Sequence, residues 1–286
     1  MELSKYDVFL KVVEKGSFSA AAEELGYSPS GLNRMMSALE TELDLPVFNR
    51  NKKGICLTHN GEQIIEYIRK MVYWERQLKE YIAEVKGLET GHLNVGTIYS
   101  FASTLLPDLV RRFRAIYPNI TISIMQGGHQ ELSTWLEEGK ADLIFTTGRG
   151  QMENWVTLKK DPMVVWVSKD HPFASKPFFP WNRIEKEPFI LTMAGHDTDT
   201  EFFAKENDLK LNIQYSSRDY YTTYRMVEAG LGISMNNLMM TQHWSGEVVV
   251  LPLKPEAYVE MGIQFPRHRS LSAKKFFECI GPDELG

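Results

Sequence analysis

The sequence predicts a chain in three parts: a small helical domain ending in a short hairpin, one long helix, and a larger α/β region. Residues 17–50 carry capping signals for two helices joined by a tight turn, followed by a bend into a strand. Residues 58–89 contain no proline and, between Gly61 and Gly87, no glycine. Beyond Gly91, apolar runs typical of strands alternate with helical patterns.

Composition and sequence patterns argue against secreted, membrane-spanning and metal-binding proteins. The chain has 286 residues, 43% hydrophobic and 24% charged, which fits two or three ordinary globular domains. The N-terminus has no signal-peptide core, and no segment reaches the roughly 18 apolar residues of a membrane span. We therefore expect a cytoplasmic protein with no membrane partner. Cys56 and Cys279 lie far apart and the seven histidines are scattered, so no metal site and no cofactor is expected.

The first helices are predicted by their apolar faces and caps. Lys5 to Lys15 forms one helix, with a buried stripe that contains Phe9, Val12 and Val13. Ser17 caps the next helix and Gly26 ends it. That helix has a face of small residues that lets another helix approach closely, made of Ala20, Ala21, Ala22 and Leu25.

Ser28 and Pro29 predict the start of a further helix, because serine accepts hydrogen bonds from free backbone amides and proline fits the first helical position. Its inward positions are Leu32, Met36, Leu39 and Leu43, and its outward positions are Ser30, Asn33, Arg34 and Ser37. A capped helix that presents Asn and Arg near its N-terminus is typical of a helix-turn-helix in the DNA major groove. The alternative is an amphipathic helical hairpin with an ordinary polar face.

Val47 to Leu57 reads as a β-hairpin, with turn residues from Asn51 to Gly54. Arg50, Lys52 and Lys53 make it basic, although the whole chain has a net charge of −5. We interpret the hairpin as a wing that lies along the DNA backbone or minor groove. The alternative is a solvated hairpin tip.

The long helix has its N-cap at Thr58. Its apolar positions follow 4-3 spacing, with Glu75 as the one interruption, at Ile64, Ile68, Met71, Leu78, Ile82 and Val85. Sustained spacing of this kind predicts a coiled-coil seam between two copies of the chain. The alternative is a helix that packs on its own chain.

The segment from Tyr6 to Gly61, which includes FLKVVEKGSFSAAAEELGYSPSGLNR, resembles the winged helix-turn-helix domain of LysR-type transcriptional regulators. The resemblance implies a DNA-binding domain at 1–58, a linker and dimerisation helix at 59–89 and an effector-binding domain at 90–286. Pro29 stands where the family often carries Gln, and Asn33 where it often carries Ser. We expect DNA contacts from Ser17, Ser28, Pro29, Ser30, Asn33, Arg34, Ser37, Arg50, Lys52 and Lys53, with Asn33 as a principal reader of base identity.

After Gly91 the pattern is strand, helix, strand, helix, strand: HLNVGTI, a helix near 103–117, ITISIM, a helix near 129–138, and ADLIFTT. This order predicts βαβ units and a mostly parallel sheet. The segment FRAIYPNITISIMQGGHQELSTWLEEGKADLIFTTG also resembles the LysR effector domain. The resemblance implies two α/β lobes like those of periplasmic solute-binding proteins. Lobe I spans about 90–160 and 261–286, and lobe II spans about 161–260.

A ligand is expected between the lobes, where strand ends and helix N-termini meet. Hydroxyl groups and helix N-termini suit a carboxylate or another small anion. The candidate effector contacts are Tyr99, Ser100, Gly128, His129, Thr146, Thr147, Thr192, His196, Arg218 and Asn236.

Catalysis has little support, because the chain has no GxSxG elbow, P-loop or metal-ligand spacing. Gly230 to Ser234 lacks the third glycine of a dinucleotide loop and stands at a helix-to-strand turn. A solute receptor is the main competing class, and a redox sensor through Cys56 and Cys279 is another. The expected function is a sequence-specific transcription regulator, not an enzyme, with double-stranded DNA, a small effector and a second copy of itself as partners. The resemblance adds RNA polymerase as a possible partner, and a dimer or a tetramer.

Overall fold

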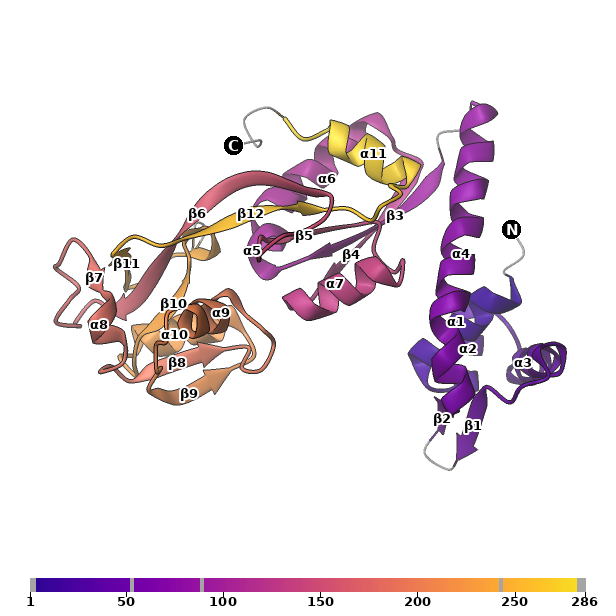
Figure 1. Ribbon diagram of the computed structural model, residues 1–286, viewed down its shortest axis with the longest axis horizontal. Coiled ribbons are helices and arrows are strands. Elements are labelled where there is room, and N and C mark those ends of the chain that lie inside the picture. Colours follow the sequence, from indigo (N-terminus) through magenta and orange to yellow (C-terminus); the bar gives the residue numbers. More distant parts are fainter. Residues whose placement is uncertain (1–3, 52–53, 88–89, 242–243, 282–286) are drawn as a thin grey trace. The chain divides into compact units, whose positions relative to one another are not determined.

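The computed structural model describes residues 4–51, 54–87, 90–241 and 244–281. The chain divides into two compact units, and the main boundary follows Lys86. Figure 1 shows the elements of each unit. Within the described residues, no helix is both long enough and apolar enough to cross a membrane.

The N-terminal unit has the helices and the hairpin that the sequence predicts. Its elements are α1 (Lys5–Lys15), α2 (Phe18–Leu25), α3 (Pro29–Leu43), β1 (Phe48–Asn51), β2 (Gly54–Leu57) and α4 (His59–Val85). Ser17, Ser28 and Thr58 each accept a backbone N–H at the start of α2, α3 and α4. Gly26 ends α2 with φ of 70°, in the left-handed region that favours glycine.

One apolar core holds this unit together. Ala21 and Ala22 are fully buried, which allows α2 to lie close to its neighbours. Ile65 and Ile68 of α4 are buried in the same core as Phe9 of α1. The first turns of α4 therefore pack on their own unit, as one of the two sequence alternatives proposed. The later seam residues Met71, Leu78, Ile82 and Val85 are exposed.

The second unit is built on an eight-stranded sheet and a two-stranded one. Its strands are β3 (Gly91–Thr97), β4 (Ile120–Gln126), β5 (Leu143–Thr147), β6 (Trp155–Ser168), β7 (Phe179–Pro180), β8 (Phe189–Thr192), β9 (Ile213–Ser217), β10 (Ser234–Asn237), β11 (Val248–Lys254) and β12 (Tyr258–Gln264). Its helices are α5 (Tyr99–Ser103), α6 (Leu105–Ile116), α7 (His129–Glu137), α8 (Trp181–Ile184), α9 (Asp199–Glu206), α10 (Tyr220–Glu228), η1 (Leu238–Thr241) and α11 (Leu271–Glu278).

The prediction of βαβ units and a parallel sheet is confirmed for the strands on which it was based, β3, β4 and β5, but it does not extend to β6 and β12. β3 pairs in parallel with β4 and β5, as βαβ units require. The strands β5, β10 and β11 that flank β12 and β6 are all antiparallel to them, and β12 and β6 are antiparallel to each other. The sheet is mixed because the chain leaves the first lobe along β6 and returns along β12.

Separate apolar cores define two lobes in this unit. Lobe I has its core around β3, β5, α6 and α11, with Phe113, Phe145 and Phe276 among the buried rings. Lobe II has its core around β8, β10, β11 and the second half of β6, and includes Phe179 and Phe189. The strands β6 and β12 pair from Gln264 opposite Trp155 to Tyr258 opposite Pro162, and they run between the lobes.

The helix expected near 103–117 is confirmed as α6, and a short helix that the sequence did not predict, α5, precedes it. Thr104 separates the two with φ of −121° and ψ of −78°, and its Oγ1 donates to the Ser100 carbonyl at 2.6 Å. The short helix α5 precedes the break and carries Tyr99 and Ser100. Serine and threonine side chains that bond local carbonyl groups compete with regular helix geometry.

Candidate functional site

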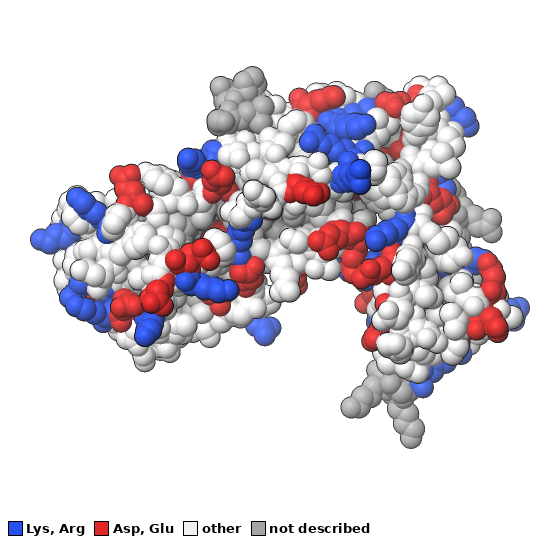
Figure 2. Space-filling view, viewed as in Figure 1, with Lys and Arg blue, Asp and Glu red and all other residues white. Residues whose placement is uncertain are grey.

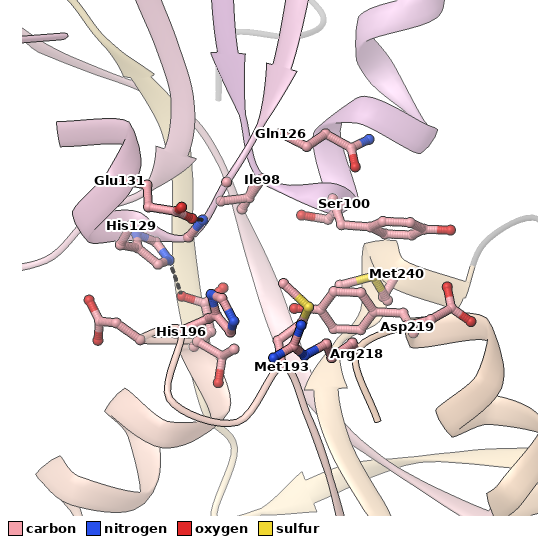
Figure 3. A pocket seen from close by; sticks show the side chains of 17 residues that line it. Ile98, Ser100, Gln126, His129, Glu131, Met193, His196, Arg218, Asp219 and Met240 are labelled. Atoms are coloured by element: carbon pink, nitrogen blue, oxygen red, sulfur yellow. Dashed lines mark hydrogen bonds and ion pairs between the residues drawn. The ribbon is translucent and has the colours of Figure 1, made fainter. Parts of the chain in front are cut away.

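A cavity of about 410 Å³ lies between the two lobes. In Figure 3, Ser100, Gln126 and Glu131 of lobe I face Met193, Arg218 and Asp219 of lobe II. Of the residues that the sequence suggested for effector binding, the cavity is lined by Tyr99, Ser100, Gly128, His129, His196 and Arg218.

Ser100 has an unusual position on this wall. Its side chain is 1% exposed, and its Oγ has no hydrogen-bond partner among the described residues. A buried hydroxyl without a partner is disfavoured by about 1–3 kcal/mol, so such groups are rare in folded proteins. Because Ser100 also lines the cavity, its hydroxyl is a candidate donor to a ligand there.

Arg218 supplies the second available donor. It precedes α10, it is exposed, and within the described residues it forms no ion pair. Among the described residues, it is the only Lys or Arg that lines the cavity. A guanidinium group binds carboxylate and phosphate groups through paired N–H donors.

A cluster of five polar residues joins the lobes beside the cavity. We name it the interlobe cluster, and it consists of His129, Thr147 and Arg149 from lobe I and Asp197 and Asp199 from lobe II. Asp199 Oδ1 accepts from Thr147 Oγ1 at 2.5 Å and lies 3.0 Å from His129 Nε2. Arg149 donates to Asp199 Oδ1 at 3.3 Å and to Asp197 Oδ1 at 2.5 Å.

These bonds determine the ionisation of Asp199. Burial alone would raise the pKa of this carboxyl group, but the hydrogen bond and charge of His129, the Thr147 hydroxyl and the Arg149 charge outweigh it and hold the pKa at about 2. His129 Nδ1 also lies 2.8 Å from Thr146 Oγ1. Both ring nitrogens of His129 are thus engaged by the protein.

Gly128 marks a close approach of the two lobes. A Cβ atom at this position would lie 2.3 Å from the backbone carbonyl oxygen of His196. The Gly128 N–H donates to Glu131 Oε2 at 3.0 Å. The N-terminus of α7 is therefore already capped by a carboxylate of its own first turn.

Aromatic rings form another part of the wall. Tyr99 of α5 and Tyr220 of α10 have ring centroids 5.0 Å apart, so this contact also joins the two lobes. The ring centroid of Trp244 lies 6.2 Å from that of Tyr99. Burial and the charges of Asp199 and Glu201 raise the pKa of Tyr220, so its hydroxyl stays protonated.

The remaining suggested effector residues do not line this cavity. Thr146 and Thr147 line a neighbouring cavity that shares His129 and Asp197. Thr192 is buried and donates to Thr223 Oγ1 at 2.7 Å. Asn236 is buried and donates to Ser234 Oγ at 3.3 Å. These four side chains have protein partners, and we do not include them among the proposed ligand contacts.

Sequence reasoning missed all four acidic residues of the lining, which are Glu131, Asp197, Asp199 and Asp219. It also missed Arg149, which lies outside this cavity. Asp219 carried a usable signal, because an Asp before a helical pattern is a common N-cap, and it accepts from Thr222 N at 2.5 Å. Glu131 carried a signal as well, because a Glu three residues after the residue that precedes a helix often accepts from that residue's N–H, here Gly128 N. Arg149 and Asp199 carried none, because their contacts join distant parts of the sequence.

In the N-terminal unit, α3 presents the residues suggested for DNA binding. Ser28 Oγ accepts from Gly31 N at 3.1 Å, Pro29 occupies the first turn, and Ser30 and Arg34 are exposed. Asn33 is half-buried, and its Oδ1 is buried without a partner among the described residues. Ser17 accepts from Ala20 N at 3.4 Å at the start of α2.

Arg50 of the hairpin is held against α3. Its Nη2 donates to Ser37 Oγ at 3.3 Å and lies 3.5 Å from Glu40 Oε2, and its guanidinium stacks over the Phe18 ring at 5.2 Å. Glu40 also accepts from Val47 N at 2.8 Å and so fixes the hairpin beside the helix. Lys52 and Lys53 lie outside the described residues.

In Figure 2, acidic and basic side chains are interspersed over the visible face of the second unit. No group of three or more His, Cys, Asp or Glu within the described ranges could hold a metal ion. Cys56 and Cys279 are both free thiols.

A winged helix-turn-helix followed by a long helix and a two-lobed domain with a cavity defines a class of ligand-responsive, DNA-binding regulators. Residues 3–62 match the model of the bacterial regulatory helix-turn-helix protein, lysR family, and residues 86–282 match the LysR substrate binding domain. The chain belongs to the LysR family of transcription regulators.

Individual relatives are similar to this protein over nearly the whole chain, in sequence or in structure. The HTH-type transcriptional regulator YvbU of Bacillus subtilis is 28% identical over 97% of this chain and 97% of its own length. The HTH-type transcriptional activator CmpR of Synechocystis is 29% identical over 97% of this chain and 94% of its own. Among solved structures, CbnR superposes with a TM-score of 0.70 at 18% identity over 100% of both chains. A full-length OxyR variant from Pseudomonas aeruginosa gives 0.72 at 22% identity over 98% of this chain and 93% of its own.

Proposed function

We propose that this protein binds an operator through α3 and the β1–β2 wing, and that a small molecule with an anionic group, held between the lobes of the second unit, controls its activity. The single observation that carries the effector part is Ser100. Its hydroxyl is buried and has no partner in the part of the chain that the structure describes, and the residue lines the cavity. Arg218 adds a positive charge on the opposite lobe. A carboxylate between these two groups would satisfy both.

On the DNA side, we propose base contacts by Asn33 and Arg34. Asn can bond an adenine edge and Arg a guanine edge through paired hydrogen bonds. The sequence placed Asn33 on the outward face of α3, but its side chain is half-buried and its Oδ1 is buried, so base contact requires this side chain to turn outward. Ser28, Ser30 and the N-terminus of α3 would bond phosphate groups. Arg50 would contact the DNA backbone only in exchange for its bonds to Ser37 and Glu40.

We propose a homodimer as the unit that binds DNA. Four apolar residues of α4 are between 43% and 71% exposed, namely Met71, Leu78, Ile82 and Val85. Exposed apolar side chains in 4-3 spacing are covered when two helices form a coiled coil. Among the relatives, CbnR has been crystallised with its target DNA, and CmpR is named an activator. By analogy with other regulators of the family, the effector would change the arrangement of dimers on DNA and their contact with RNA polymerase. The protein would act in the cytoplasm.

The test is selection of bound duplexes from a random DNA pool by the full chain, repeated over a series of salt concentrations. We expect enrichment of an inverted repeat with an interrupted centre, because a symmetric dimer reads two half-sites. Binding should weaken as salt rises, since phosphate contacts release counterions. Recovery of no sequence, with only weak salt-sensitive binding, would contradict the proposed function.

Asn33→Ala tests the role of one residue within that experiment. We expect it to lower the ratio of specific to nonspecific affinity by about tenfold, which corresponds to one lost base contact of about 1–3 kcal/mol. Arg34→Ala is the matched variant on the same helix. An unchanged ratio for Asn33→Ala would show that this side chain does not read the operator.

A further inference from the structure

The charges around the interlobe cavity do not suit a ligand that is only anionic. Four carboxylates line the cavity, those of Glu131, Asp197, Asp199 and Asp219, whereas Arg218 is the only Lys or Arg among the lining residues. Asp197 and Asp199 are paired with Arg149 of the interlobe cluster. Glu131 and Asp219 have no such cation beside them within the described residues. A second anionic group on a ligand would meet repulsion here.

Carboxylates already accept from one backbone amide at each helix N-terminus that borders the cavity. Glu131 accepts from Gly128 N, which precedes α7, and Asp219 caps α10 through Thr222 N. A capping carboxylate uses the backbone donors and the dipole that would otherwise attract a ligand anion. Ser100 and Arg218 are therefore the only donors we assign to an anionic group, and together they suit one carboxylate.

Acceptors remain on the other parts of the wall. All bonds of the interlobe cluster to Asp199 converge on Oδ1, so its Oδ2 has no partner among the described residues. Glu131 uses Oε2 for its cap, and its Oε1 likewise has no partner there. The Tyr99 and Tyr220 rings, 5.0 Å apart, add electron-rich faces that attract cations.

We propose that the effector is a zwitterion, a small molecule with one carboxylate and one ammonium group, of the chemical class of free amino acids. Its carboxylate lies on Ser100 and Arg218, and its ammonium group lies near Glu131 and Asp199. The inference rests on the proposed effector site, because it uses Ser100 and Arg218 as the carboxylate anchor. Two carboxylate acceptors and an aromatic wall then exclude dicarboxylates and select an ammonium group.

Matched probes test this inference on the full chain. Each set keeps one carbon skeleton and changes only the charged groups, for example valerate, glutarate, norvaline and δ-aminovalerate, with corresponding sets on shorter, longer and aromatic skeletons. Affinity is measured by calorimetry, after a screen for a rise in Tm. We expect an amino acid to bind at least about tenfold more tightly than the monocarboxylate and the dicarboxylate of its set.

Two variants separate the inference from the function on which it rests. Glu131→Gln keeps an acceptor for Gly128 N but removes the charge, and should abolish the preference for the amino acid. Ser100→Ala should weaken every carboxylate probe by about tenfold. If a dicarboxylate or monocarboxylate binds as tightly as the amino acid, the proposal of a zwitterionic effector is wrong, but the proposed effector site is not contradicted. Binding that Ser100→Ala does not change would overturn the anchor, and an absence of binding in all sets would overturn both.

Discussion

The interlobe cluster and the Ser100 wall border the same cavity, yet their polar groups are in opposite states. In the cluster, Asp199 Oδ1 alone accepts from His129, Thr147 and Arg149. On the Ser100 wall, a hydroxyl that is 1% exposed has no partner among the described residues, and Arg218 has none either. Groups that are satisfied within the protein join the two lobes, and the groups that are not satisfied are those we propose as ligand contacts.

This comparison predicts that substitutions in the cluster change stability, whereas substitutions on the Ser100 wall change affinity. The largest effect is expected for Asp199→Ala. It leaves the buried His129 and the half-buried Arg149 without their shared acceptor, while Arg149 keeps Asp197. The loss of a buried ionic partner is typically worth about 3–5 kcal/mol. Unfolding in urea measures the free energy directly. Arg218→Ala is the control, because an exposed residue without a partner should change it by less than about 0.5 kcal/mol.

If both variants lost the same amount of stability, the distinction between the two walls would be wrong. If Asp199→Ala lost none, the interlobe cluster would not hold the lobes in solution.

The same cluster predicts a dependence on pH. The pKa of Asp199 is about 2 in the folded protein, below its ordinary value of 3.8. A depressed pKa stabilises the fold above the unfolded value, and this contribution is lost as the pH falls through the folded value. The contribution should amount to about 2 kcal/mol.

Unfolding free energies of the wild type and Asp199→Asn check this prediction. Their difference should be constant above about pH 5 and should shrink as the pH falls toward about 2. A difference that does not change over this range would mean that the ionised carboxylate is not what stabilises the cluster.

Gly128 should have the next largest effect, because it lies where the lobes approach most closely. In Gly128→Ala the new methyl group would lie 2.3 Å from the His196 carbonyl oxygen, so the lobes must separate. Overpacking of this kind typically costs about 1–3 kcal/mol. Gly148→Ala is the matched control in the same lobe, because its Cβ would have only ordinary contacts at 3.4 Å and beyond. Thermal unfolding of the pair should show a lower Tm for Gly128→Ala alone, and equal values would mean that the approach is loose in solution.

The parts of this fold that follow from local sequence are those that the sequence predicted well. Ser17, Gly26, and Ser28 followed by Pro29 set the ends of α2 and α3 through bonds within a few residues. Chemistry of this local kind does not depend on the rest of the chain. The same holds for Ser100, since a strand end followed by a helix start brings its residue to the edge of a sheet.

The parts that the sequence did not predict depend on long-range contacts. The mixed sheet arises because β12 returns between β5 and β6, more than a hundred residues after β5 in the chain. The interlobe cluster joins Arg149 to Asp199 across a distance in sequence that no periodicity encodes. Thr192 and Asn236 looked like strand-end ligand contacts, but their partners Thr223 and Ser234 are known only once the strands are in place.

The smallest effect on stability, and the sharpest contrast with the cluster, is expected for Ser100→Ala. The Ser100 hydroxyl has no partner among the described residues, so its removal takes no bond from the free protein and relieves a buried polar group. The free energy of unfolding should therefore stay within about 0.5 kcal/mol of the wild type or rise slightly. Effector affinity should fall about tenfold in the same variant, because a ligand carboxylate loses its donor. Urea unfolding and calorimetry on one preparation measure both values, and a loss of stability without a loss of affinity would assign Ser100 to the fold instead of the ligand.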